Sequence, residues 1–168
     1  MRPFVTAAAL LAAWVCCAAS AGASAGSCSL TLPSTVSVGN YDPTRIATPT
    51  IVTFTLLYGC QTGASATNLT ITAGPGAHAG GSFGTRSMSA GGSDRLNYWL
   101  YPPGFTVTAH SSANVWGDGS GLSNVWGPFS VTAGATAMSG TASIQIESNQ
   151  DVSAGTYTDP VVFTMVFI

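Results

Sequence analysis

Short alternations of apolar and polar residues recur along the chain, and none of them extends into a helical period. The clearest spans residues 51–60, where every second residue from Val52 to Cys60 is apolar. Period-two alternation bounded by Gly, Ser, Asn and Pro is typical of strands with one buried face. A series of such segments predicts an all-β sandwich or barrel.

Further alternations predict strands at residues 69–73, 96–101, 129–131 and 141–147. An earlier alternation, from Leu30 to Val38, is interrupted by Pro33. Because proline cannot donate to a ladder, this interruption predicts an edge strand or a bulge. The glycine-rich residues 74–84 are expected to form a mobile loop. Nothing in the pattern suggests a second domain.

The last strand is predicted at residues 161–168, which contain neither charge nor glycine. Alternation places Val161, Phe163, Met165 and Phe167 on one face. β-branched and aromatic residues dominate the segment, as in a strand buried on at least one face. We expect no later element to cover it, so its partner must come from outside the chain. An internal segment lying along residues 161–167 would argue against this interpretation.

The composition predicts a surface with very few charged residues. Only 6% of the residues are charged, against roughly 25% in an ordinary soluble domain. Apolar residues make up 46% of the chain, and it contains no lysine. A surface of Ser, Thr, Asn and Gly gives little charge repulsion against association. The composition excludes a basic nucleic-acid surface and a phosphate-binding P-loop, which needs its lysine.

The first 21 residues have the organisation of a secretory signal peptide. Arg2 forms the charged region, residues 4–19 form the apolar region, and small residues allow cleavage between 21 and 25. The apolar region is too short to span a bilayer comfortably. We therefore predict one domain at residues 26–168, with no transmembrane segment once the signal is removed.

Cleavage would leave two cysteines, Cys28 and Cys60. In an exported chain they most simply form one disulfide, between the start of one strand and the end of another. That geometry suits adjacent antiparallel strands. The alternative is two free buried thiols. A zinc site would need more ligands than these cysteines and the distant His78 and His110 offer.

No catalytic constellation is visible. The acids lie mostly in predicted turns, where Asp caps backbone amides, and nothing selects a pair of them. Both histidines lie in small-residue loops and are interpreted as solvated. We predict no cofactor and no enzymatic activity. Trp116 and Trp126 could stack on a sugar or another surface; the alternative is two core aromatics at strand ends.

Several segments, taken in order, resemble a known family. They are Cys28, Asn40–Pro43, Ile51–Cys60, Arg86–Met88, Leu96–Tyr101, Val115–Gly119 and Gly155–Asp159 ahead of a terminal strand. Together they resemble the spore coat protein U domain, the fold of archaic chaperone–usher pilus subunits.

The resemblance implies an incomplete immunoglobulin-like β-sandwich that lacks its last strand. It implies a structural pilus subunit, exported through the periplasm to the cell surface, with roles in adhesion and biofilm. Its partners would be a periplasmic chaperone, an outer-membrane usher and other pilus subunits, and a chaperone or a neighbouring subunit would lend the missing strand. The expected donor-strand groove comprises Leu30, Leu32, Val161, Phe163, Met165 and Phe167.

One departure from the family concerns the donor segment. Such subunits carry an alternating apolar segment before the first cysteine, whereas residues 20–27 are all Ala, Gly or Ser. The chain is therefore expected to accept a strand without donating one, which predicts a place at the fibre tip. The alternative is a secreted glycan- or surface-binding module that is not assembled into a fibre.

Overall fold

The computed structural model describes residues 7–16, 28–43, 49–61, 68–105, 107, 114–130, 132, 134 and 137–167, and for 7–16 it describes the backbone. The strands are β1 (Ala7–Cys16), β2 (Cys28–Thr31), β3 (Thr35–Tyr41), β4 (Thr50–Cys60), β5 (Asn68–Ala73), β6 (Ser87–Ser89), β7 (Arg95–Tyr101), β8 (Trp126–Ser130), β9 (Met138–Ile146), β10 (Thr156–Thr158) and β11 (Val161–Phe167). One 3-10 turn covers Phe83–Thr85. The predicted all-β class is confirmed.

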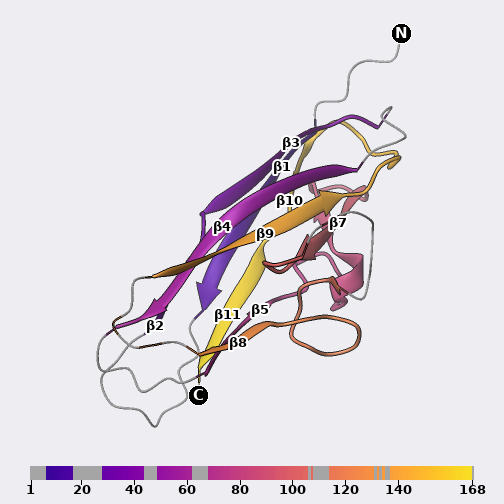
Figure 1. Cartoon of the computed structure of the whole chain (residues 1–168). Coiled ribbons are helices and arrows are strands. Elements are labelled where there is room, and N and C mark those ends of the chain that lie inside the picture. Colours follow the sequence, from indigo (N-terminus) through magenta and orange to yellow (C-terminus); the bar gives the residue numbers. More distant parts are fainter. Residues whose placement is uncertain are drawn as a thin grey trace.

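The strands follow one curled path in the order β2-β4-β9-β7-β6-β10-β1-β11-β5-β8, with β3 paired to β1. The curl brings β4 and β9 over β1 and β11, as Figure 1 shows. Phe54 of β4 and Phe163 of β11 meet edge to face between these layers, with ring centroids 6.3 Å apart. The result is a sandwich-like fold around one main core.

β4 and β9 form the longest ladder, which pairs Thr50 with Ile146 at one end and Tyr58 with Met138 at the other. The predicted alternation of β4 is confirmed, because Phe54, Leu56 and Tyr58 are buried while their sequence neighbours face outward. Both strands therefore contribute one apolar face to the core, as period-two patterning requires.

The interruption at Pro33 falls where the chain changes partner. Before it, β2 pairs with β4, and after it, β3 pairs with β1. A proline removes one backbone donor, so a ladder cannot continue through it without loss. The predicted break is therefore also a change of neighbour.

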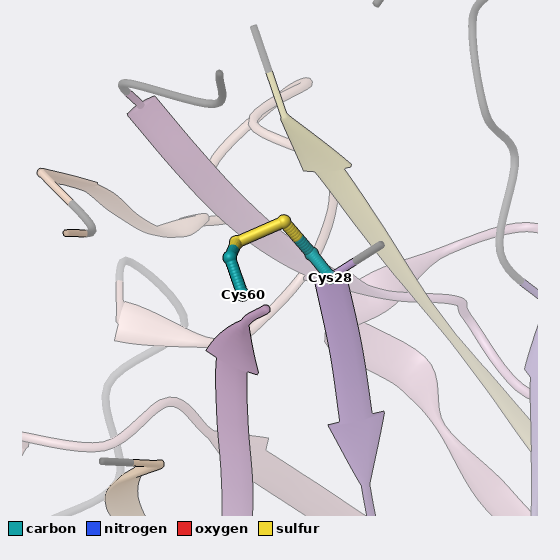
Figure 2. Close-up of a disulfide and its surroundings, with 2 residues drawn as sticks. All are labelled: Cys28 and Cys60. Atoms are coloured by element: carbon teal, nitrogen blue, oxygen red, sulfur yellow. A yellow bond between two sulfur atoms is a disulfide. The ribbon is translucent and has the colours of Figure 1, made fainter. Parts of the chain in front are cut away.

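Cys28 and Cys60 form a disulfide, and they are direct register partners of the antiparallel pair β2–β4 (Figure 2). Their Cα atoms lie 3.9 Å apart. The predicted bridge and its strand geometry are both confirmed.

The apolar alternation of β11 is confirmed as well: Val161, Phe163 and Met165 are buried, while Val162 and Val166 are each 43% exposed. The prediction about its neighbours is wrong. We expected no internal segment along residues 161–167, yet β11 lies between β5 and β1. Residues 7–16 supply the second neighbour.

No helix in the described part of the chain is long and apolar enough to cross a membrane.

Candidate functional site

The candidate site is the slot that β1 fills, bounded by β3 on one edge and by β10 and β11 on the other. Along β10 and β11 the pairing is parallel and keeps one register, from Ala8 opposite Thr156 to Cys16 opposite Thr164. Along β3 the pairing is antiparallel, with one irregularity after Ala8. A single segment therefore joins β3 to β10 and β11, strands with which β3 is not itself paired among the described residues.

Buried apolar side chains line both walls of this slot. They are Val36, Val38 and Tyr41 from β3, Tyr157 from β10, and Val161, Phe163 and Met165 from β11. The register places Ala9, Leu11, Ala13 and Val15 opposite Tyr157, Val36, Val161 and Phe163 respectively. Every second residue of β1 thus stands at a register position beside the core.

The backbone of the neighbouring strands gives a second reason why a strand must fill this slot. Without β1, the inner edges of β3 and β11 would present unpaired N–H and C=O groups beside an apolar surface. Buried backbone groups are nearly always paired in native proteins. The slot therefore needs a strand of some origin.

The predicted groove residues are partly brought together here. Val161, Phe163 and Met165 lie on the wall formed by β11, and the backbone of Phe167 pairs with Leu69 of β5. The opposite wall is β3, which pairs with β1, whereas Leu30 belongs to β2, which pairs with β4. Leu30 and Leu32 pack against the same core. Val36 and Val38 belong to the same predicted alternation, so the sequence carried a signal for them.

A buried polar network lies at the start of β11. Its cation, Arg86, is fully buried and donates to four backbone carbonyls. The shortest of these bonds, both 2.6 Å, run from Nη2 to the oxygens of Gly74 and Trp116. Burial lowers the pKa of Arg86 to about 10, while Tyr98 and Asp159 act in the opposite direction. Donation to carbonyls offsets the cost of enclosing the guanidinium.

The matching anion is Asp159, which lies between β10 and β11 and is also fully buried. Its carboxylate accepts from the Ala77 amide at 2.8 Å, from the Tyr98 hydroxyl at 2.6 Å and from His78 Nδ1 at 3.2 Å. Burial, and then the charge of Asp159, raise the pKa of Tyr98 well above its usual value of 10. Tyr98 therefore keeps its proton at physiological pH and continues to donate to the carboxylate.

This network explains two departures from the sequence interpretation. His78, expected to be solvated, pairs with Asp159 and is 29% exposed. The loop at residues 74–84, expected to be mobile, is held by Asp159 and Arg86. A Cβ at Gly76 would overlap the Asp159 carboxylate, so glycine permits this close approach. His110 lies outside the described residues.

Four of the segments on which the family resemblance depends meet in this network. Arg86, Tyr98, Trp116 and Asp159 come from four of those segments, and their side chains or carbonyls meet here. These segments could be selected from the sequence, but their connection through Arg86 and Asp159 could not. The network anchors the start of β11, which forms one wall of the slot.

The two tryptophans lie in or against the core. Trp116 is fully buried and donates from Nε1 to the Ile71 carbonyl at 3.0 Å. Trp126 is partly buried, with its ring 4.9 Å from Tyr58 and 4.8 Å from Phe129. These positions favour the core interpretation over the surface-contact one. Within the described residues no group of His, Cys, Asp and Glu could hold a metal ion.

The sequence also matches a model of a known protein family. The model, described as Spore Coat Protein U domain, matches residues 13–164. The matched region contains the buried network and the first part of β11, residues 161–164. No curated protein sequence matches the chain.

Proposed function

Because the chain belongs to the Spore Coat Protein U domain family, we propose that it is a structural subunit of a chaperone–usher surface pilus. It accepts a complementing strand from a periplasmic chaperone or from a neighbouring subunit. The family assignment favours a structural role over an enzymatic one, and it favours export to the cell surface.

One observation carries this proposal. The second neighbour of β11 is β1, and β1 lies inside the segment that the sequence predicts to be a cleaved signal peptide. Removal of that segment leaves an apolar slot, bounded by unpaired strand edges, that another chain can fill by strand addition. The chain's low charge makes an unfilled slot prone to aggregation.

The test uses the processed chain, starting at residue 26, expressed with and without its chaperone. Synthetic N-terminal segments of other subunits are then offered to the chaperone complex. We expect a soluble complex only with the chaperone, and displacement of the chaperone by a segment that donates a strand. A processed chain that is a stable, soluble monomer by itself would contradict the proposal.

Placement at the fibre tip is the narrower part of the proposal. It depends on residues 20–27, which lack large apolar side chains and lie outside the described residues. A peptide covering residues 20–34 should fail to complement any other subunit of the fibre. Complementation by that peptide would remove the tip assignment and leave the acceptor role intact.

The alternative of a secreted glycan-binding module depended on Trp116 and Trp126. Trp116 is fully buried, so one of the two tryptophans that this alternative needs is not exposed at the surface. The acceptor role is therefore the function that the site supports best.

A further inference from the structure

We propose that a pocket between two loops, here called the loop pocket, binds one ring of a neutral sugar. It has a volume of about 330 Å³ and lies between residues 81–84 and residues 120–123, with Val115 also in its lining. Both loops lie at the right of Figure 1, the first in pink and the second in orange. None of these residues belongs to the strands that bound the slot. The inference therefore goes beyond the acceptor role and does not depend on it.

The apolar part of the loop pocket is supported by a second, smaller core. Val115 is buried in a cluster with Trp99 and Tyr101, and Phe83 packs against that cluster. Trp99 and Tyr101 alternate along β7 with Leu100, which belongs to the main core. The pocket therefore rests on the face of β7 that points away from the main core.

Arg86 holds both sides of the loop pocket in place. Its Nη1 donates to the Phe83 carbonyl at 3.2 Å, and its Nη2 donates to the Trp116 carbonyl at 2.6 Å. The guanidinium carbon lies 5.5 Å from the centre of the Phe83 ring. One buried side chain thus connects the first loop to the segment that leads into the second. A site held in this way loses less conformational entropy when it binds a ligand.

The second loop is also held by its own hydrogen bonds. The amide and the hydroxyl of Ser123 both donate to the Ser120 carbonyl, at 3.1 and 2.7 Å. The Gly119 amide donates to the Ser123 hydroxyl at 3.2 Å. A Cβ at Gly117 would overlap Ser123, so glycine permits this close approach. These contacts fix the second loop opposite the first.

The side chains that line the loop pocket combine an apolar surface with hydroxyl groups, and among these described residues none is charged. They are Phe83, Val115 and Leu122, and Ser82, Ser120 and Ser123. Ligand pockets typically pair apolar and aromatic walls with a few polar groups that orient the ligand. A sugar ring matches this lining, because its C–H face suits the flat face of an aromatic ring. Its hydroxyls suit serine, which both donates and accepts.

The charges near the loop pocket favour a neutral sugar over an acidic one. Asp118 is exposed and accepts from the Ser120 amide at 2.8 Å. Hydrogen bonds from the Ser120 side chain and amide hold the pKa of Asp118 below its usual value. An ionised carboxylate here repels an anionic ligand. Arg86 cannot compensate, because it is fully buried and already donates to backbone carbonyls.

Leu122 gives a further reason for a ligand at this position. It is 70% exposed, the highest value among the large exposed apolar residues that the structure describes. It also lines the loop pocket. A sugar ring bound between Phe83 and Leu122 would cover part of this apolar surface, which favours binding.

The test uses the mature chain, labelled with ¹⁵N and purified from the periplasm with its chaperone, or alone if it is soluble alone. The probes are the methyl glycosides of glucose, galactose, mannose and N-acetylglucosamine. At least one of them should shift the amide signals of residues 81–84 and 120–123 in a saturable way. Methyl glucuronide, which carries a carboxylate in place of a hydroxymethyl group, should bind more weakly than methyl glucoside.

Two substitutions test the assigned contacts. Phe83→Leu keeps an apolar side chain against the second core but removes the ring, and it should weaken binding about tenfold. Ser120→Ala should weaken it about threefold. The matched controls are Phe105→Leu and Ser139→Ala, which alter exposed residues outside the loop pocket and should leave binding unchanged. Thermal unfolding of each variant shows whether it is folded.

Three outcomes would overturn the inference. The first is that none of the four glycosides shifts these amides. The second is that Ser120→Ala and Phe83→Leu, both folded, bind as tightly as their controls. The third is that hexanol shifts the amides and no sugar does, which would assign the loop pocket to an apolar ligand. None of these outcomes bears on strand acceptance, which the chaperone-displacement experiment tests separately.

Discussion

Asp159 is the residue on which the buried network depends, because three donors converge on its carboxylate. Asp159→Asn keeps the shape but removes the charge and turns one acceptor into a donor. Hydrogen bonds to buried charged groups each contribute about 1.5–3 kcal/mol, so we expect the free energy of unfolding to fall by about 2–4 kcal/mol. Urea unfolding of the full chain measures it.

Asp151→Asn is the matched control, since Asp151 is exposed. Its effect should stay within about 0.5 kcal/mol. Equal effects of the two substitutions would show that the charge of Asp159 adds nothing to stability.

Tyr98 gives a prediction about pH. Its pKa is raised in the folded state by burial and by Asp159. The unfolded chain therefore loses this proton first as pH rises, and the stabilisation, complete below about pH 10, declines above it. Tyr98→Phe cannot ionise and should lose stability less steeply in alkali. Denaturation midpoints from neutral to alkaline pH measure the two slopes, and identical slopes would contradict the assignment.

At the scale of the element, the disulfide joins two strands early in the chain. The free energy of unfolding of the Cys28→Ser/Cys60→Ser chain should be lower by about 3–4 kcal/mol. The disulfide closes a loop of sequence separation 32, and without it the unfolded chain gains conformational entropy. Guanidinium unfolding measures this loss. A Cys16→Ser/Cys17→Ser chain controls for thiol removal, and a loss of the same size there would contradict the explanation.

β11 allows a comparison within one strand. Phe163 is buried against Phe54 and Trp116, whereas its neighbour Val162 is 43% exposed. Phe163→Ala should lower the free energy of unfolding by about 3–5 kcal/mol, and Val162→Ala by about 0.5 kcal/mol or less. Thermal unfolding of both chains checks the alternation, and a reversed order would show that the outer face is the covered one.

The elements that could be predicted are those whose own residues alternate. β4, β9 and β11 show period-two patterns, and Pro33 marked the break between β2 and β3. β1 could not be predicted as a strand, because residues 7–16 are apolar at every position and carry no period of two. β6 and β10 are three residues long, too short for a pattern.

The site was predicted only in part for a similar reason. The apolar face of β11 is a local pattern, so Val161, Phe163 and Met165 could be selected from sequence. The bonds of Arg86 and Asp159 join residues far apart in the chain, and pairing at that separation depends on the fold. No local pattern around Arg86 or Asp159 indicates which residues they bind.

For the whole molecule, the decisive property is a closed sandwich with very little charge. Four basic and six acidic residues give a net charge of −2. Charge repulsion of this size hardly opposes association at any ionic strength. Solubility should therefore depend on whether the slot is filled rather than on salt.

We expect the processed chain alone to aggregate at similar rates in low and high salt, while the full chain, in which β1 fills the slot, stays monomeric in both. Light scattering and size-exclusion chromatography measure the two states. A full chain carrying Leu11→Pro should behave like the processed chain, because its slot strand is broken while its charge is unchanged. If low salt alone kept the processed chain monomeric, surface charge rather than strand complementation would control its solubility.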